Sequence, residues 1–283
     1  MAGIVTKIRR WTVHRMTYPK LAASTDAVLS SYPKSGRTWF RFILSNYLTD
    51  VHKLDTSIDL HTTFSVTPNL DRDPLRGLPA FKYEQYRPAL PKIAVSHLAY
   101  DARLFQKKPI IFMVRDPRDV LVSSYFHATR HKHRFSGDIG TFLADREQGA
   151  ADVIRYLNGW AEGLARHPHF VLSYEALSAD PEGMTAAALR FLKCPVDAAA
   201  VRSAVEASRF EAMREIEKSD GIPGHEYDRS DDESLRMRRG VAGGFADYLS
   251  PSEVYWIEKT CATGLTPAAR ALVAMTNLNL QAA

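Results

Sequence analysis

The segment SSYPKSGRTWFRF, residues 30–42, joins an apolar run to an amphipathic one through a short turn that holds Lys34, Ser35 and Gly36. The apolar run before the turn predicts a buried strand, and the apolar spacing after Thr38 predicts a helix. A glycine in such a turn lets the backbone approach an anion closely, and the first N–H groups of a helix offer free donors. Together with the ammonium of Lys34 and the neighbouring hydroxyls, these features predict a phosphate-binding loop.

The lysine of this loop precedes the only glycine, which is the reverse of the order in an ATP-binding Walker loop. The Walker pattern requires a glycine, four residues, and then Gly-Lys-Ser/Thr. The segment does not meet it, so an ordinary Mg-ATP loop is not indicated. The remaining alternative to an anion site is a plain strand-to-helix turn with Lys34 at the surface.

Strand and helix patterns alternate along the chain. Strands are predicted at residues 26–33, 92–97, 108–116 and 169–175, and helices at residues 38–48, 117–130, 181–193, 197–208 and 251–262. This alternation predicts an α/β fold, a single domain with a mostly parallel central sheet flanked by helices. Residues 50–90 and 218–247 are rich in Asp, Pro, Gly and Ser and predict long loops, which in compact domains often bind ligands.

The composition is that of a globular protein with a mild excess of positive charge. Of 283 residues, 45% are hydrophobic, and the formal net charge is +5, which suits an anionic ligand without indicating nucleic acid. Cys194 and Cys261 match no metal-ligand spacing and fit a reducing cytoplasm, where we expect the protein to act. No apolar run is long enough to span a membrane.

A basic segment, residues 1–24, precedes the domain, which we place at residues 25–283. Ile4 and Trp11 stand there among lysines and arginines, without the continuous apolar core of a signal peptide. We expect the segment to dock on its own domain. The alternative is a helix at residues 1–20 that makes peripheral contact with a membrane surface.

Four segments, in sequence order, resemble the signatures of the PAPS-dependent sulfotransferases. YPKSGRTW (residues 32–39) resembles the loop for the 5′-phosphosulfate, with Arg37 as the one departure, and VRDPRDVLVSSY (residues 114–125) resembles the signature for the 3′-phosphate. RFEAMREIEK (residues 209–218) resembles the segment whose phenylalanine packs on adenine, and MRRGVAGGF (residues 237–245) resembles the late Arg-Lys-Gly loop. The resemblance implies a P-loop-like transferase of EC class 2.8.2 that moves the sulfuryl group of PAPS to a hydroxyl or an amine.

The resemblance also implies the residues of the site. His97, at the end of the second predicted strand, would take the acceptor proton, and Lys34 would stabilise the departing phosphate during in-line displacement. The nucleotide would be bound by Lys34, Ser35, Gly36, Arg37, Thr38, Trp39, Arg115, Ser123, Tyr174, Phe210, Arg238, Arg239 and Gly240. Within that set the 3′-phosphate would be held by Arg115, Ser123, Arg238, Arg239 and Gly240, and the adenine by Trp39, Phe210 and Tyr174.

The sequence departs from the family pattern at three places besides Arg37. Val95 stands where many members carry a lysine near the transferred group, and Gly244 and Phe245 replace Asp-Trp in the late loop. The short dimer motif of the family is not recognisable in ADYLSPSE, residues 246–253. The oligomeric state therefore stays open.

The acceptor is the least determined part of the function. We expect a small molecule in a pocket formed by the two long loops, lined by Phe64, Phe81, Tyr83, Tyr86 and Tyr125. The alternatives are a glycan or glycolipid acceptor, a kinase or NTPase-like protein, or an idle nucleotide-binding scaffold. No metal is expected, because a sulfuryl group carries less charge than a phosphoryl group and no carboxylate cluster is evident. No nucleic-acid partner is expected either.

Overall fold

The computed structural model describes residues 18–280 and centres on a four-stranded sheet whose strands all run parallel. The order across the sheet is β2, β1, β3, β4, with bounds β1 Ala27–Ser31, β2 Ile93–Ser96, β3 Ile110–Val114 and β4 His169–Ser173. The first three strands are buried along their whole length, as expected for a parallel sheet covered on both faces. The predicted strands and fold class are confirmed.

The longer helices are α2 Arg37–Val51, α5 Pro117–Phe126, α7 Ala150–Leu164, α8 Tyr174–Ala179, α9 Pro181–Phe191, α10 Ala198–Ala207, α11 Phe210–Asp220, α12 Pro251–Gly264 and α13 Pro267–Val273. The short elements are α3 Thr63–Val66, α4 Ala102–Phe105, α6 Ile139–Ala144, the turns η1 Leu78–Ala80, η2 Glu84–Tyr86, η4 Asp232–Ser234 and η5 Gly244–Asp247, and the π-helical turn η3 His127–His131. The predicted helices are present, although α5 ends in the π turn, where Lys132 N–H donates to His127 O at 2.9 Å.

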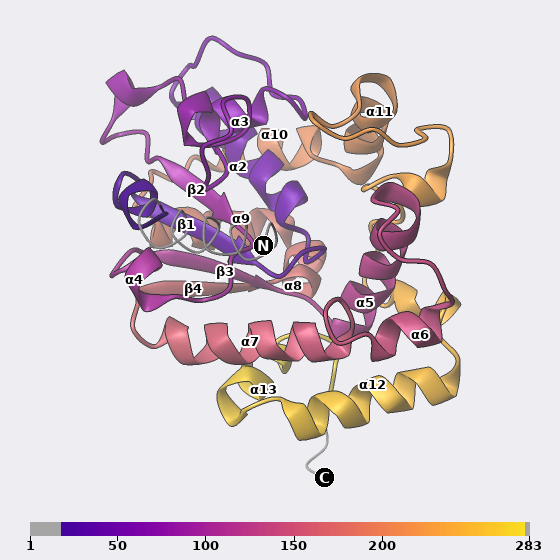
Figure 1. The fold of residues 1–283 in the computed structure, drawn as a ribbon. Helices are drawn as coiled ribbons and strands as arrows, with labels where there is room; N and C mark the ends of the chain where they lie inside the picture. The colour runs from indigo at the N-terminus through magenta and orange to yellow at the C-terminus, as the bar shows by residue number, and fades with distance from the viewer. Residues whose placement is uncertain (1–17, 281–283) are drawn as a thin grey trace, which may run out of the picture.

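Helices cover both faces of the sheet (Figure 1). Successive strand residues face opposite sides. Val28 and Phe112 pack in the cluster that includes α5, α7, α12 and α13, whereas Leu29 and Ile111 pack in the cluster that includes α2, α8, α9 and α10. The sheet is thus the middle of three layers, and its carboxyl edge is left to carry the site.

Helix α7 was not among the predicted helices, although it is one of the longest. It carries Gly159 and Gly163, and glycine weakens a helical pattern. The second glycine is required by packing, because a Cβ at residue 163 would lie 2.4 Å from Cδ2 of Tyr100. Fully buried Trp160 anchors the helix and donates to Leu98 O at 3.0 Å. Tertiary contacts therefore stabilise a helix that local propensity does not indicate.

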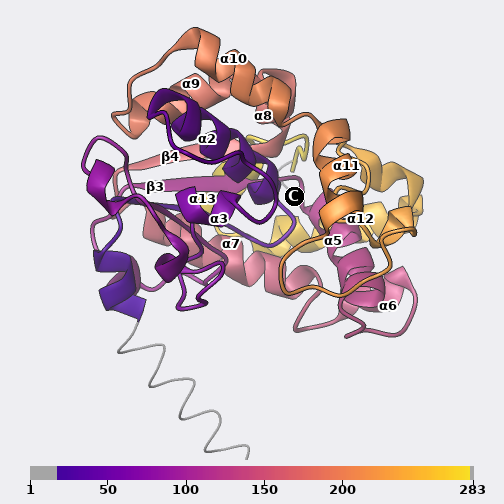
Figure 2. The same cartoon turned by 90° about the horizontal axis from the view of Figure 1, so that it is seen from above.

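The two long segments predicted as loops contact one another. Arg76 donates to Pro223 O at 3.0 Å, and a ring nitrogen of His61 lies 3.3 Å from Asp220 O. Figures 1 and 2 both show α11, which leads into the second segment, on the same side of the molecule as α5 and α6. The short helices within these segments do not change their irregular character, so the prediction is confirmed in outline.

The beginning of the chain is described from residue 18 onward. Residues 18–23 are helical, and Ala22 is buried in the core beneath the sheet. Most of the predicted basic segment, residues 1–17, lies outside the described residues. Within residues 18–280, no helix combines the length and the apolar character needed to cross a membrane.

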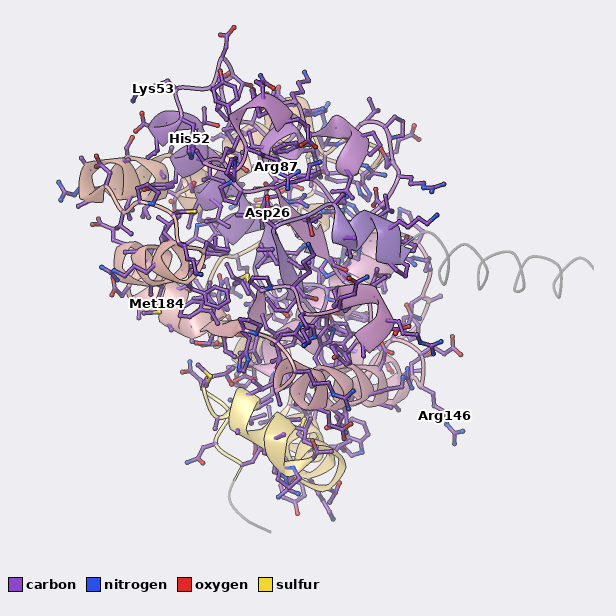
Figure 3. The ribbon with its side chains drawn as sticks, turned by 90° about the vertical axis from the view of Figure 1, so that its left-hand side faces the viewer. Asp26, His52, Lys53, Arg87, Arg146 and Met184 are labelled. Atoms are coloured by element: carbon purple, nitrogen blue, oxygen red, sulfur yellow. The ribbon has the colours of Figure 1, made fainter. Side chains whose placement is uncertain are left out.

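The amino edge of the sheet is closed by an ion pair between Asp26 and Arg87, which Figure 3 shows side by side. The closest contact is 2.8 Å. In the same region the ammonium of Lys92 lies 4.9 Å from the ring centre of Phe81, and Tyr83 packs edge-on against that ring. Both aromatics belong to the core, at the edge opposite the carboxyl ends of the strands. The prediction that Phe81 and Tyr83 line the acceptor pocket is therefore wrong.

Candidate active site

The turn between β1 and α2 has the backbone geometry of an anion cradle. Lys34 and Gly36 both have positive φ, 71° and 88°, and the N–H groups of the first turn of α2 follow directly. Position 36 has no room for a side chain, because a Cβ there would lie 2.5 Å from Cδ2 of Tyr174. Ser35 is buried, whereas Lys34 keeps partial exposure and makes no side-chain hydrogen bond or ion pair within residues 18–280.

Crowding and charge depress the basicity of that lysine. Desolvation of the ammonium in the packed loop, together with the positive charges of Arg236, Arg115 and Arg238, lowers the pKa of Lys34 to about 7. The negative charge of Glu217 acts in the opposite direction. An ammonium held under these conditions gains more than an ordinary surface lysine from an anion beside it.

The residues predicted for the 3′-phosphate come together around one hollow. Its lining comprises Arg115, Ser123, Arg238, Arg239 and Gly240, all predicted, with Asp119, Arg236, Val241 and Gly244. The guanidinium of Arg115 donates to Lys34 O at 3.3 Å and to Val241 O at 2.9 Å, so it connects the phosphate loop with the late loop. Its Nε is buried with no partner among the described residues, which leaves a donor for an anion.

The two arginines of the late loop are held differently. Arg238 forms an ion pair with Glu233 at 3.2 Å, and its guanidinium lies 4.3 Å from the ring centre of Phe126. Arg239 is more exposed and pairs with Asp247 at 2.6 Å. Arg238 is therefore fixed at the rim of the hollow, whereas Arg239 can exchange an exposed ion pair for a ligand at little cost.

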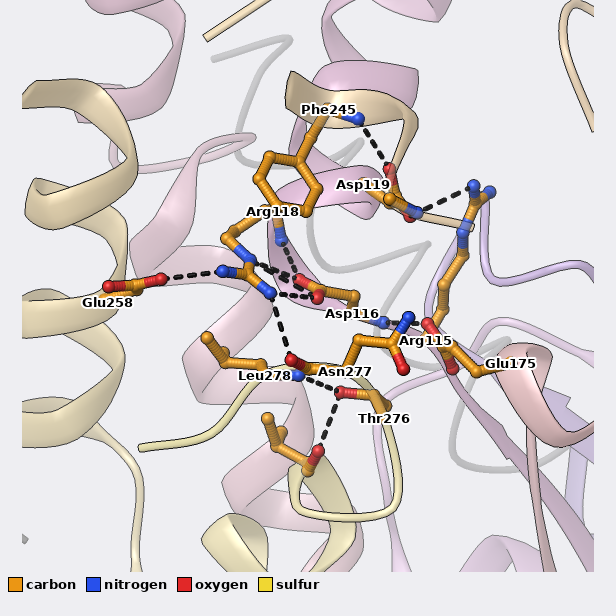
Figure 4. Close-up of polar contacts among 12 residues, drawn as sticks. Arg115, Asp116, Arg118, Asp119, Glu175, Phe245, Glu258, Thr276, Asn277 and Leu278 are labelled. Carbon is orange, nitrogen blue, oxygen red and sulfur yellow. Dashed lines mark hydrogen bonds and ion pairs between the residues drawn. The ribbon is translucent and has the colours of Figure 1, made fainter. Parts of the chain in front are cut away.

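Asp119 fastens the late loop to α5 (Figure 4). Its carboxylate accepts the N–H groups of Gly243 at 2.8 Å and Phe245 at 2.9 Å, and it lies 3.5 Å from Arg115. The ring of Phe245 packs under the guanidinium of Arg118, 4.2 Å from the ring centre. The departure at Phe245 thus has a structural role in holding the loop.

The three aromatic residues predicted for adenine lie near the loop. Trp39 and Tyr174 meet edge to face with ring centres 5.7 Å apart, and Arg115 lies 4.1 Å from the ring centre of Tyr174. Phe210 packs against the same small cluster as Trp39 and also covers Gly240, where a Cβ would lie 2.2 Å from its ring. The backbone at Gly240 and the Phe210 ring are thus positioned by each other.

His97 follows β2 at the carboxyl edge of the sheet, beside the end of β1. Its Nδ1 lies 2.8 Å from Ser31 O. A carbonyl only accepts, so Nδ1 carries the hydrogen and Nε2 keeps a free lone pair. The residue is exposed at the surface, yet desolvation, followed by the positive charges of Arg37, Arg236 and Arg41, lowers the pKa of His97 well below its usual range. The ring is therefore a neutral base at neutral pH.

Sequence reasoning missed several charged residues of this site. Arg236 lines the 3′-phosphate hollow, and its charge lowers the pKa of Lys34, Arg37 and His97 alike. Arg41, one turn after Arg37 on α2, is buried beside them. Two features of the sequence could have indicated these residues. Arg37 and Arg41 stand four residues apart on one helix, and Arg236 stands two residues before the predicted Arg238.

A second hollow adjoins the first and carries two histidines that were not predicted. Its lining comprises Lys34, Ser123, Phe126, His127, His131, Glu233, Ser234, Leu235 and Arg238. The rings of His127 and His131 stack with centres 4.7 Å apart in the π turn. Desolvation and the charges of Lys34 and Arg236 lower the pKa of His127, and the same causes, with Arg236 the larger charge, lower that of His131 to about 4.

The structure also shows where Val95 lies, the residue that stands in place of the lysine found in many family members. Its side chain is 1% exposed and packs with Leu29 in the core above the sheet. Arg37 instead lies within electrostatic reach of His97 and Asp71. A cation is thus present near His97, although it comes from α2 rather than from β2.

Comparison with known proteins identifies the family of this chain. The chain matches the family described as "Sulfotransferase domain" over residues 24–269. Sulfotransferase 2A6 of Mus musculus is 26% identical over 246 residues, which cover 83% of this chain and 82% of the relative. Flavonol 3-sulfotransferase of Flaveria bidentis is 26% identical over 265 residues, which cover 86% of this chain and 84% of the relative.

Solved structures agree on the fold. Mouse sulfotransferase SULT7A1 complexed with PAP superposes with a TM-score of 0.63 at 19% identity, covering 91% of this chain and 94% of that one. Retinol dehydratase in complex with androsterone and inactive cofactor PAP superposes with a TM-score of 0.61 at 20% identity, covering 93% and 87%. At such identities the likeness concerns the arrangement of the sheet and helices.

Proposed function

This chain belongs to the sulfotransferase family and is a sulfuryl-transferring enzyme, and from that premise we propose that its donor is PAPS and its acceptor a hydroxyl or amine of a small molecule. The observation that carries the proposal is a pair of adjoining cationic subsites. One is the Lys34 loop and the other is the hollow around Arg115, whose guanidinium bonds to Lys34 O. A nucleotide with anionic groups at both its 5′ and 3′ ends requires two such subsites.

The residues present fit this nucleotide. The unpartnered ammonium of Lys34 and the turn at Gly36 suit the 5′ end, and the orphaned Nε of Arg115 suits the 3′-phosphate. Trp39, Tyr174 and Phe210 would enclose the adenine. When bound, PAPS supplies an activated sulfuryl group on a phosphate leaving group.

The chain's own residues would supply positioning, a base and a cation. Nε2 of His97 takes the proton of the acceptor hydroxyl, while the hydrogen bond from Nδ1 to Ser31 O holds the ring in the required tautomer. Lys34 and the loop N–H groups stabilise the charge that develops on the leaving side. The base and the cation are tied to adjacent strands, so their relative position is set by the sheet.

The remaining expectations stay predictions. A glycan or glycolipid acceptor remains the alternative to a small molecule, and the family assignment leaves no support for a kinase or an idle scaffold. Among residues 18–280 no group of three or more His, Cys, Asp or Glu side chains is arranged to hold a metal ion, and we propose that transfer proceeds without one. A cytoplasmic location and docking of the N-terminal segment are likewise proposed.

The proposal is tested by ligand binding and by transfer. Adenosine 3′,5′-bisphosphate (PAP) in the presence of EDTA should raise Tm, because a ligand at about 100 times its Kd adds roughly 2.7 kcal/mol of stability. ATP with Mg²⁺ should raise it less. Sulfur-labelled PAPS should then label an acceptor. Absence of any Tm shift at millimolar PAP would overturn the assignment of the donor.

A further inference from the structure

Resting on the proposed function, we propose that the acceptor carries an anionic group of its own, a carboxylate or a phosphate ester, in addition to the hydroxyl that receives the sulfuryl group. Arg37, Arg41 and Arg236 place positive charge around His97. Arg41, like Lys132 beside Arg236, belongs to neither of the two subsites proposed for the nucleotide. Of the five aromatic residues expected to line the acceptor side, Phe64 lies beside Arg41, with its ring centre 4.7 Å from the guanidinium. An acceptor at this site would therefore meet positive charge as well as an aromatic ring.

Arg37 and Arg41 form the first part of this lining. They stand four residues apart on α2, where like charges destabilise a helix. Arg37 has no side-chain hydrogen bond or ion pair within residues 18–280. Arg41 is 5% exposed, donates to Asn69 Oδ1 at 2.5 Å, and keeps a buried Nε with no partner. Both charges act on His97, so the missing acceptor belongs beside the base.

His225, Lys132 and Arg236 form the second part. The Nε2 of His225 lies 2.8 Å from a guanidinium nitrogen of Arg236, and its Nδ1 lies against the ammonium of Lys132. A neutral imidazole accepts at one nitrogen only, whereas both cations are donors. His131 adds a further ring nitrogen 3.4 Å from the same Nδ1. This group has more donors than acceptors, and an anion would correct the imbalance.

The buried carboxylate nearest to Arg236 is already occupied. Glu217 is completely buried, and its oxygens accept the N–H of Arg236 at 2.8 Å, the N–H of Met237 at 2.9 Å and the hydroxyl of Tyr227 at 2.7 Å. Its lone pairs are thus directed at the backbone of the late loop. The Nε of Arg236 is left buried without a partner among the described residues.

The other carboxylates on this side do not balance the arginines. Asp73 pairs with Arg76 at 2.9 Å, on the segment that contacts residues 218–247. Asp71 is the carboxylate whose charge acts on both Arg37 and Arg41. One carboxylate therefore faces two arginines, one of them buried, and this leaves a net positive charge beside His97.

The test compares paired acceptors that differ in charge. Binding is measured on PAP-saturated enzyme, so that the donor site is filled, and transfer is measured with PAPS in place of PAP. The pairs are 3-(4-hydroxyphenyl)propionate with its amide, and glucose 6-phosphate with glucose. Calorimetry gives Kd for each, and PAPS-driven transfer gives kcat/KM. The anionic member should bind about tenfold or more tightly, as expected for charge-assisted hydrogen bonds, in at least one pair.

Variants identify the residues responsible. Arg41→Gln and Lys132→Gln should each reduce the anion preference several-fold while leaving the affinity for PAP near that of the unaltered enzyme. Lys132 is partly exposed, so its variant remains informative where loss of buried Arg41 prevents folding. The matched control is Lys53→Gln, whose side chain is 82% exposed, and it should keep the full preference.

Two failures are distinguishable. If PAP binds and both members of each pair bind equally, or neither binds at millimolar concentration, the anionic-acceptor proposal is overturned while the donor assignment stands. If PAP itself does not bind, the donor assignment fails, and the inference falls with it. A preference for the amide and for glucose would also overturn the inference.

Discussion

Gly36 lies so close to the ring of Tyr174 that a Cβ on residue 36 would stand 2.5 Å from the Cδ2 of the tyrosine. The residue also has a φ of 88°, which an L side chain adopts only with strain. Gly36→Ala should therefore destabilise the protein by about 1–3 kcal/mol and weaken PAP binding more than tenfold, because the loop must move. Tm and PAP titration measure the two effects.

The matched control is Gly159→Ala in α7. A Cβ there meets no atom within 4 Å, and alanine is the better helix former by about 1 kcal/mol. This variant should be as stable as the parent or slightly more so, with unchanged PAP affinity. Equal behaviour of the two alanine variants would contradict the role assigned to the Gly36–Tyr174 contact.

Binding of PAP should depend on pH through Lys34. Its pKa in the free site is about 7, and bound phosphate would raise that pKa by stabilising the ammonium. Binding then takes up a proton above pH 7, so affinity should fall between pH 7 and 9, by at most about tenfold per pH unit. Calorimetry in buffers of different ionisation enthalpy measures the uptake. Lys34→Arg, charged throughout, should show a flatter profile; a flat profile in the parent enzyme would count against the assignment.

Turnover should remain high on the acidic side because of His97. Its lowered pKa keeps the ring neutral below the ordinary histidine range, so the acid limb of kcat/KM should lie below about pH 6.5. An acid limb centred above that value would contradict the assignment. His97→Ala should lower kcat by about two to four powers of ten, with partial recovery for phenols of low pKa. Lys34→Ala should show no such recovery, because its defect is on the leaving side.

Discrimination between PAPS and adenosine 5′-phosphosulfate should depend on Arg115. Arg115 lines the hollow assigned to the 3′-phosphate and has a buried Nε without a partner among the described residues. A charge-assisted hydrogen bond contributes about 1.5–3 kcal/mol. Arg115→Ala should weaken PAPS binding by about ten- to a hundredfold and leave the 5′-phosphosulfate compound nearly unaffected. Arg202→Ala, at a side chain that is 70% exposed, is the control. Equal losses for both nucleotides would remove Arg115 from that role.

Arg118 is predicted to be a stability residue. Its guanidinium bonds to Asp116, to Glu258 on α12 at 2.6 Å and to Asn277 O at 3.2 Å (Figure 4). Arg118→Ala would leave the 1% exposed carboxylate of Asp116 unpaired, at a cost of about 3–5 kcal/mol. Urea unfolding should show this loss, and Arg103→Ala, at a side chain that is 71% exposed, should not. A loss below 1 kcal/mol would contradict the prediction.

Many residues of the proposed nucleotide site could be named from the sequence because they stand in recognisable local segments. Arg115 follows a strand and Ser123 lies on the next helix, so their placement follows from elements that form locally. The hollow also requires Arg238, which lies far along the chain in an irregular segment. The loop that carries Arg238 is held there by hydrogen bonds from the N–H groups of Gly243 and Phe245 to Asp119. The pattern of residues does not reveal these bonds.

What the sequence by itself determined is the α/β fold with its four strands, and the placement of Lys34 and His97 at the ends of two of those strands, where we propose that they bind phosphate and act as the base. Each of these features depends on a short stretch of sequence, where periodicity, glycine and capping act locally. Only the tertiary structure decided the character of the acceptor side. It buried Phe81 and Tyr83 at the far edge of the sheet and brought Arg41 and Arg236 to the cleft. The physical reason is that the burial of a side chain and the net charge around it depend on neighbours from distant segments of the chain. A local sequence pattern does not contain those neighbours.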